Sequence, residues 1–440
     1  MGAVPGSENG HGFAQREENR FVRALLTFMV SAPSRPSRVR MILVLGALIA
    51  LGPLTIDMYL PALPRIAEEL DVTSSVIQLT LTGTLAGLAL GQLIVGPLSD
   101  SLGRRRPLIA GVVLHMVASL LCMFAPSITA LGIARGLQGM GAAAAAVVAV
   151  AVVGDLFTGS TAAAVLSRLM LVLGVAPVLA PSLGAVVLLE ASWRWIFGAL
   201  VLMAAGLLLI AAFALPETLP AAHRRPLQIR GIASTYGQLL RDARFIALVL
   251  VGALAMAGLF AYIAGAAFVL QEHYGLNQQV FAVVFGAGAV ALIAATQFNV
   301  VLLNRFTPQR IVVCALAVAT LAGLVFVAVT LTRFGGVVGF LVPAWTVLAS
   351  MGFVMPNAPA LALSRHPEAA GTAAALLGSA QFGLGAVIAP VVGLLGNDER
   401  ALALVMTVSA SLALILMLVV RPQPQPVVAS PAVEAVPERA

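Results

Sequence analysis

The chain has 440 residues, of which 60% are apolar and only 10% carry a charge. Soluble globular proteins have roughly 45–50% apolar and about 25% charged residues. This composition leaves too little charge to solvate a surface, so it excludes a soluble enzyme, a disordered chain and a nucleic-acid-binding domain. The two cysteines, Cys122 and Cys314, lie in apolar runs and provide neither a disulfide framework nor a metal site.

Apolar runs of about 20 residues, the length that crosses a bilayer as a helix, recur along the chain. The first six lie near residues 41–60, 76–97, 108–125, 130–152, 164–187 and 194–215. The last six lie near residues 245–268, 279–302, 310–331, 336–359, 372–395 and 401–420. The sequence therefore predicts an all-α membrane protein with twelve transmembrane helices. We expect an N-terminal half at 41–215, a polar cytoplasmic loop at 216–243 and a C-terminal half at 244–420.

Two further segments are expected to lie outside these halves. Residues 1–38 are polar and contain no apolar stretch long enough for a usual signal peptide. Met29 and Met41 are alternative start sites to Met1. Residues 421–440 are rich in proline and are expected to be a disordered cytoplasmic tail.

All 25 basic residues are arginines, and their distribution predicts the orientation. If the N-terminus is cytoplasmic, most arginines fall on the inner side, and the outer segments hold only Arg65, Arg194, Arg333 and Arg400. Cytoplasmic loops of membrane proteins are enriched in basic residues. We therefore expect both termini in the cytoplasm, and the net charge of +7 needs no nucleic-acid partner.

Two charged residues interrupt the apolar runs: Asp57 in the first and Arg135 in the fourth. A charge at the bilayer centre costs at least about 2.5–3.5 kcal/mol, so such residues are functional candidates. Burial disfavours a carboxylate and a nearby guanidinium favours it. Asp57 can therefore bind and release a proton as its surroundings change, which coupling to a proton gradient requires. A static Asp57–Arg135 pair, or an Asp57 near the outer water without a role, is the alternative.

Arg135 stands beside Gly136, Gly139 and Gly141, which allow neighbouring helices to approach closely. Its permanent charge can hold a carboxylate or organise water; a structural arginine bonded to backbone carbonyls is the alternative. His115 in the third run can titrate near neutral pH. No second intramembrane histidine is near it in sequence, so a packing role is favoured.

The segment GPLSDSLGRRRPL, residues 96–108, lies between the second and third runs. We expect its two glycines to allow a tight turn, Asp100 to favour a helix N-terminus and the arginines to reach carboxylates. The segment resembles the signature loop of the major facilitator superfamily, Gly-x-Leu-x-Asp-x-x-Gly-Arg-Arg/Lys. In that family the loop latches the two halves in one conformation. The resemblance implies a conformational gate made of Gly96, Asp100, Gly103, Arg104, Arg105 and, as partner, Asp155.

Two other motifs narrow the resemblance. LGIARGLQGMGAA, around Arg135, resembles the family's fourth-span motif, in which the arginine is linked to proton transfer. VLGVAPVLAPSLGA resembles the antiporter motif of the fifth span, although alanines replace the usual glycines. Its corresponding residues are Ala176, Pro177, Ala180, Pro181 and Gly184. With DMYLPALP, WRWIF and LPETL, it resembles the bicyclomycin/chloramphenicol-resistance (Bcr/CflA) branch of drug:proton antiporters. Gly154 stands where that branch often has arginine.

The resemblance implies two pseudo-symmetric six-helix halves that rock about a central site. It implies a proton-driven exporter of small lipophilic neutral or cationic compounds in the bacterial inner membrane, monomeric and without a cofactor other than the proton gradient. Candidate cavity residues are Tyr59, Gln138, Asn357 and Gln381. For Asn357 and Gln381, hydrogen bonding between helices is an equal alternative.

Two other classes of function compare less well with the sequence than export does. A uniporter or symporter for a metabolite such as a sugar or amino acid is opposed only by the fifth-span motif and the branch resemblance. An enzyme is not expected, because the chain contains no HExxH, GxSxG or P-loop motif and no cluster of histidine and cysteine ligands.

Overall fold

The computed structural model describes residues 38–224 and 228–419, and no strand occurs in these two ranges. Within them, 12 helical segments are long and apolar enough to cross a membrane, as predicted. The expectations for the N-terminal segment and the C-terminal tail fall outside the described residues.

The spans follow the predicted runs with somewhat longer helices. The first six consist of α2 (Arg38–Asp57) continued by α3 (Leu63–Glu69), α4 (Ser74–Leu102), α5 (Arg105–Met123), α6 (Ile128–Leu156), α7 (Gly159–Glu190) and α8 (Arg194–Ala214). The last six consist of α10 (Ala243–Phe268), α11 (Gln278–Leu303), α12 (Pro308–Thr332), α13 (Gly336–Leu363), α14 (Ala370–Leu394) and α15 (Glu399–Val419). The central polar segment contains a further helix, α9 (Ile229–Arg241), which the sequence reasoning did not anticipate.

Side chains at the helix starts satisfy backbone N–H groups that have no partner within the helix. Ser127 accepts from Ala130 N at the start of α6 (3.3 Å), and Thr307 accepts from Arg310 N at the start of α12 (3.4 Å). Such caps favour the observed starts of these two spans.

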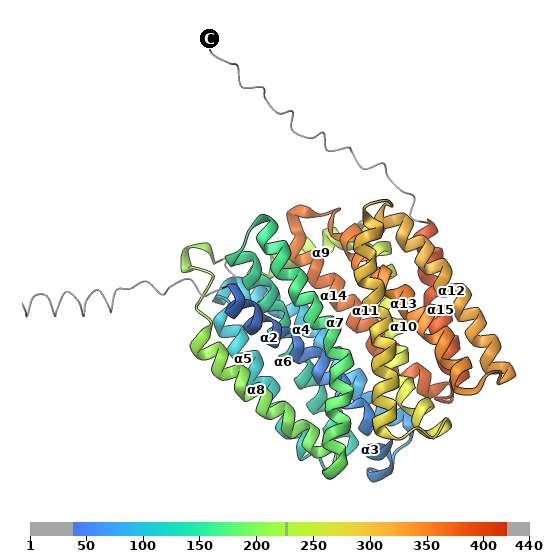
Figure 1. Ribbon diagram of the computed structural model, residues 1–440. Helices are drawn as coiled ribbons and strands as arrows, with labels where there is room; N and C mark the ends of the chain where they lie inside the picture. Colours follow the sequence, from blue (N-terminus) through green and yellow to red (C-terminus); the bar gives the residue numbers. More distant parts are fainter. Residues whose placement is uncertain (1–37, 225–227, 420–440) are drawn as a thin grey trace, which may run out of the picture. The chain divides into compact units, whose positions relative to one another are not determined.

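The described residues from Val44 onward form one compact unit. Within it, α4 packs on α6, and α5 packs on α6 and α8; in the second group, α10 packs on α14 and α15, and α12 on α13 and α15. The two groups meet where α4 packs on α14 and α7 packs on α11 (Figure 1). Counted along the chain, α4 and α14 are the second and eleventh spans, and α7 and α11 are the fifth and eighth. Moving each span six places along the chain turns one pair into the other. The contacts therefore have the pseudo-two-fold symmetry expected of two related halves.

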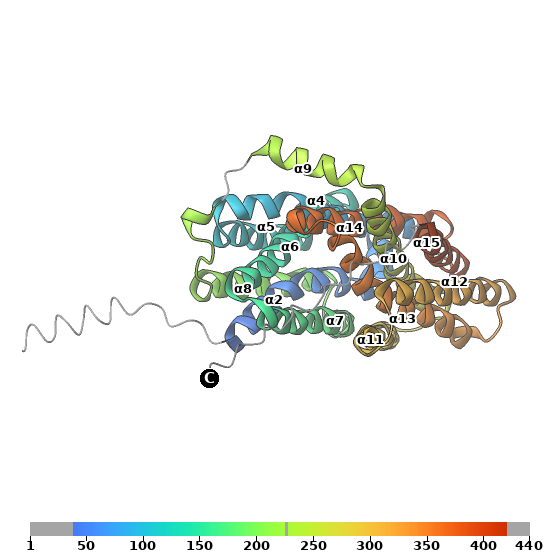
Figure 2. The same cartoon turned by 90° about the horizontal axis from the view of Figure 1, so that it is seen from above.

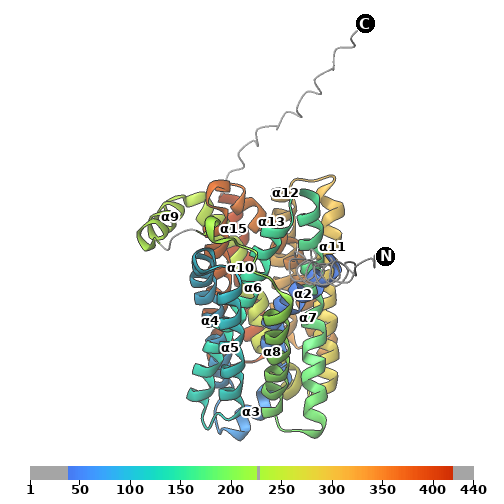
Figure 3. The same ribbon diagram turned by 90° about the vertical axis from the view of Figure 1, so that its left-hand side faces the viewer.

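Successive spans run in opposite directions, which places every connection at one of two ends (Figure 3). We call the end that holds the α4–α5 connection the Arg104 end. The other end, which holds the α3–α4 connection, is the Glu69 end.

The α-helix of the first span is interrupted directly after Asp57. Helix α2 ends at that residue, and a short 3₁₀ turn at Leu60–Ala62 leads into α3. Pro61 within the turn has no N–H to continue the helical hydrogen bonding. The acidic residue therefore lies at a helix terminus between two helical segments.

Candidate functional site

Asp57 is buried, with 3% of its surface exposed. Its Oδ1 atom has no hydrogen-bond partner among the described residues, and no ion pair joins it to Arg135. The static pair considered from the sequence is therefore absent from this conformation. A buried carboxyl without a counter-charge strongly disfavours the ionised form.

Arg135 instead binds the backbone just before Asp57. It is fully buried, and its Nη1 donates to the carbonyl of Thr55 (2.8 Å) and to Oε1 of Gln138 (2.7 Å). The guanidinium lies over the ring of Tyr59, 4.6 Å from its centroid. Arg135 thus contacts the chain on both sides of Asp57, two residues before it and two residues after it.

The ring of Tyr59 is itself fixed in place. Its hydroxyl hydrogen-bonds to Oγ1 of Thr80 on α4 (2.9 Å), and its ring packs against Phe197 on α8. A cation over an aromatic face gains about 2 kcal/mol or more when both are desolvated. This contact offsets part of the cost of burying Arg135, whose Nε and Nη2 have no hydrogen-bond partner in the described chain.

A chain of hydrogen bonds extends the Arg135 cluster to α5. Gln138 Nε2 donates to Oγ of Ser119 (2.7 Å), which donates to the carbonyl of His115 (2.7 Å). Oγ1 of Thr55 donates to the Leu51 carbonyl (2.6 Å) and so accepts from Nε2 of His115 (2.8 Å). This arrangement places a proton on Nε2 of His115, and it agrees with the packing role that the sequence favoured.

Glycines bring these helices close enough for the cluster to form. A Cβ atom on Gly139 would clash with the backbone carbonyl of Thr84 on α4, and one on Gly141 would lie 2.6 Å from that of Gly111 on α5. Gly184, in the antiporter-like motif of α7, approaches the carbonyl of Met58 so closely that a Cβ would clash there. The motif therefore packs directly against the residue that follows Asp57. Pro177 and Pro181 lie within the continuous helix α7, and Ala176 and Ala180 are buried in it.

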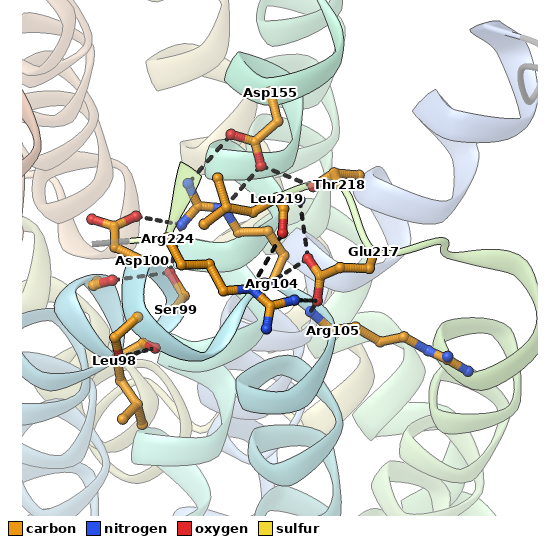
Figure 4. A network of polar contacts seen from close by, with 12 residues as sticks. Leu98, Ser99, Asp100, Arg104, Arg105, Asp155, Glu217, Thr218, Leu219 and Arg224 are labelled. Atoms are coloured by element: carbon orange, nitrogen blue, oxygen red, sulfur yellow. Dashed lines mark hydrogen bonds and ion pairs between the residues drawn. The ribbon is translucent and has the colours of Figure 1, made fainter. Parts of the chain in front are cut away.

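A second polar cluster lies at the Arg104 end (Figure 4). Arg104 donates to Asp155 at the end of α6 (2.9 Å), to Asp100 (2.5 Å) and to Ser99 Oγ (2.8 Å). Burial opposes the charge of Arg104, but its hydrogen bonds to Asp155 and Asp100 outweigh burial and raise its pKa above the ordinary value. The predicted residues Asp100, Arg104 and Asp155 thus come together.

Three details of the predicted loop were wrong. Asp100 lies in the last turn of α4, not at a helix N-terminus, and Gly96 lies inside α4, not in the turn. Only Gly103 makes the turn, with φ of 90°, a conformation that residues with a side chain rarely adopt. The guanidinium of Arg105 donates to the carbonyl of Ala212 on α8, and only the backbone N–H of Arg105 reaches a carboxylate.

Glu217 occupies the place at the start of α5 that was expected for Asp100. Its carboxylate accepts from the backbone N–H of Arg104 (2.8 Å), Arg105 (3.3 Å) and Leu219 (3.0 Å). Burial acts to raise the pKa of Glu217, but these N–H donors lower it overall. A Cβ on Gly103 would lie 2.8 Å from Cδ of Glu217, so the glycine also makes room for this carboxylate.

Thr218 completes the link between the LPETL segment and the loop. Its hydroxyl donates to Asp155 Oδ2 (2.8 Å), the oxygen that Arg104 also binds. From the sequence, LPETL is only a branch motif, and neither Glu217 nor Thr218 has a predicted role. A carboxylate and a hydroxyl in a polar segment after the sixth span were the available signal.

The four candidate cavity residues do not form one group. Tyr59 and Gln138 belong to the Arg135 cluster. Asn357 on α13 is buried and donates to Asn299 Oδ1 on α11 (2.7 Å), a hydrogen bond between two helices. Gln381 lies half-buried on α14, beside Gly252 of α10.

Comparison with known proteins agrees with this architecture. The family model described as Major Facilitator Superfamily matches residues 43–390. The chain is 38% identical over 371 residues to YdgK of Bacillus subtilis (strain 168), described as an uncharacterized MFS-type transporter, with 83% of this chain and 91% of that protein covered. It is 31% identical over 367 residues to a bicyclomycin resistance protein homolog of Haemophilus influenzae, with 82% and 90% covered.

Among solved structures, the chain is similar to the xylose transporter XylE from E. coli in a partially occluded inward open conformation. The TM-score is 0.68 at 13% identity, with 87% of this chain and 98% of that chain covered, which is a likeness of fold alone. Family, fold and membrane spans agree: the chain is a multi-pass membrane protein of the major facilitator superfamily of transporters, and it belongs to the Bcr/CflA branch of that family.

Proposed function

We propose that the protein is a proton-driven exporter of small lipophilic neutral or cationic compounds that works by alternating access. The observation that carries this proposal is Asp57, a buried carboxyl with an unpartnered oxygen at the end of α2. The resistance named in the Haemophilus influenzae relative supports a drug-like substrate.

The proton cycle follows from the contacts around Asp57. Arg135 binds the Thr55 carbonyl and Gln138 without pairing with Asp57 in this conformation, so its electrostatic effect on the acid depends on how the helices lie. Water reaching Asp57 from outside allows protonation, and the neutral carboxyl favours return to the inward-facing state. A substrate that enters from the cytoplasm or the inner leaflet then displaces the proton. Desolvation and the guanidinium act in opposite directions, so modest movements of the helices change which protonation state is favoured.

The cluster around Arg104 is proposed to act as the conformational gate. It joins the end of α4, the start of α5, the end of α6 and the LPETL segment through Asp100, Asp155, Glu217 and Thr218. Charged hydrogen bonds of this kind are stronger than neutral ones. The sequence resemblance implies a latch between the two halves, but these bonds join only the ends of α4, α5 and α6 and the LPETL segment. We therefore propose that this group moves as one body when the Arg104 end opens or closes.

The arginine distribution supports a cytoplasmic location for the Arg104 end and for both termini. We place the protein in a bacterial inner membrane, acting as a monomer, with the two six-helix halves at 41–215 and 244–420 as its moving parts.

The experiment compares wild type with Asp57→Asn in proteoliposomes, using bicyclomycin as the probe and an imposed pH gradient. In wild type the probe should move opposite to the protons. Asp57→Asn should lower gradient-driven movement by at least about 10-fold, because no group remains to carry the proton, while exchange of probe across the membrane without a gradient persists. Asp71→Asn, at an exposed aspartate of the Glu69 end, is the matched control and should behave as wild type.

Unchanged gradient-driven export by Asp57→Asn would refute the coupling role. Movement of the probe in the same direction as the protons would instead indicate a symporter.

A further inference from the structure

Helix α9 lies in the segment that joins the two halves, and neither the coupling site nor the gate uses it. It lies outside α4 and α14, and its axis runs crosswise to theirs (Figures 2 and 3). It packs against α10 and α14 of the second half. The span of α10 begins at Ala243, two residues after α9 ends. The C-terminal end of α9 therefore lies next to the start of a candidate membrane span.

The side chains of α9 form four stripes around its axis: buried, exposed apolar, cationic and polar. Leu239 is buried against the bundle, and Ile232 and Tyr236 on the same stripe are half-buried. Next to this stripe, Ala233 and Leu240 are apolar but exposed, and Leu240 has 57% of its surface free. Residues seven apart lie on one helix face, so these two form a second apolar stripe that no described residue covers.

Arg230 and Arg241 follow directly beyond the exposed apolar stripe. Both are exposed, and neither forms a hydrogen bond or ion pair with a described residue. The adjacent Asp242 does not neutralise them, since its Oδ2 binds Arg365 (2.8 Å) and His366 (3.1 Å) and its Oδ1 caps α10. Partial burial acts to raise the pKa of Asp242, but these partners lower it overall. No acidic residue occurs within α9.

We propose that α9 is a membrane-surface helix whose exposed apolar stripe dips into the bilayer and whose arginines bind anionic phospholipid headgroups. Around the helix axis, the buried stripe faces the bundle and the exposed apolar stripe faces the acyl chains. The arginines then face the headgroups, and the polar side chains face water. Amphipathic helices with cationic residues beside an apolar face bind at the interface in this way. Because α9 connects the first half to the second and packs on α14, its lipid contacts restrain the half that it touches.

The test uses the full-length protein in nanodiscs, with Cys122→Ser and Cys314→Ser as background and a nitroxide label on Leu240→Cys or Ser234→Cys. Accessibility to oxygen, which concentrates in lipid, is compared with accessibility to a water-soluble nickel complex. The label at 240 should favour oxygen, and the label at 234, on the polar face, should favour nickel. Adding phosphatidylglycerol to phosphatidylcholine nanodiscs should move the label at 240 deeper into the bilayer, which raises its accessibility to oxygen relative to nickel.

The variant Arg230→Gln/Arg241→Gln should remove this effect of phosphatidylglycerol, with each arginine contributing about fivefold to the preference for anionic lipid. Arg230→Lys/Arg241→Lys should keep the effect, because only charge is required, and Arg305→Gln at the exposed α11–α12 connection is the control that should also keep it. Equal nickel accessibility at 240 and 234 would overturn the proposal, as would a phosphatidylglycerol effect that survives the double glutamine variant. The measurement needs no substrate, so its result does not depend on the proposed transport function.

Discussion

Asp57 and Arg135 were identifiable from the sequence because a charge inside an apolar run is costly and therefore rare. Their partners were not identifiable. The bond from Arg135 to the Thr55 carbonyl joins residues 80 positions apart, and that from the Arg104 N–H to Glu217 joins residues 113 apart. No local pattern encodes such pairings, since they depend on how separate helices pack. This is why the capping role was expected for Asp100 and found for Glu217.

Replacing Arg135 by lysine tests whether its geometry matters beyond its charge. A planar guanidinium can bind the Thr55 carbonyl and Gln138 while stacking on Tyr59, whereas an ammonium is a compact charge without a flat face. We expect Arg135→Lys to lower gradient-driven transport by at least about 10-fold, through loss of charged hydrogen bonds and of the stacked contact.

Arg168→Lys, at an exposed arginine of α7, is the matched control and should transport as wild type does. Wild-type transport by Arg135→Lys in proteoliposomes would show that the charge alone suffices.

At the scale of helices, length and hydropathy were enough to predict the spans, because a bilayer fixes both. Helix α9 was not predicted, although apolar residues at helical spacing mark it in the sequence. Ile232, Tyr236 and Leu239 repeat at helical spacing in a segment that was treated as a loop because it is polar on average. The fifth-span motif was recognised as a pattern, but only the packing of Gly184 against Met58 gives that pattern a physical role next to Asp57.

Gly184→Ala should therefore be harmful although alanine is the better helix former. The added methyl group would overlap the Met58 carbonyl and push α7 away from the turn after Asp57. Overpacking of this kind costs about 1–3 kcal/mol, so we expect a lower melting temperature in detergent and impaired transport.

Gly206→Ala provides the comparison, because a Cβ at that position of α8 would meet nothing within 4 Å. Equal stability of the two alanine variants would contradict the assigned contact.

For the whole molecule, the two halves differ in chemistry although they share an architecture. The first half holds Asp57 and Arg135 in its interior. In the second half the buried charged residue Glu399 lies at the start of α15, and the interior holds the neutral pair Asn299–Asn357. The halves are joined near the Glu69 end, where Gln78 donates to Asn397 Oδ1 (2.7 Å) and to the Ala264 carbonyl (3.1 Å). Any rocking that opens this end must break these bonds, at a net cost of about 1 kcal/mol each. A change of one unit in the pKa of a buried acid corresponds to about 1.4 kcal/mol, so a protonation event is comparable in size to one of these bonds.

The ionisation of Asp57 is the central claim, and infrared titration of the purified protein in lipid tests it without any substrate. The carbonyl stretch of a protonated carboxyl should be present at the acidic end of the physiological range and should weaken as the pH rises. This band should be missing from Asp57→Asn. If wild type and Asp57→Asn give the same titration difference spectrum, Asp57 does not change its protonation state and cannot carry the proton.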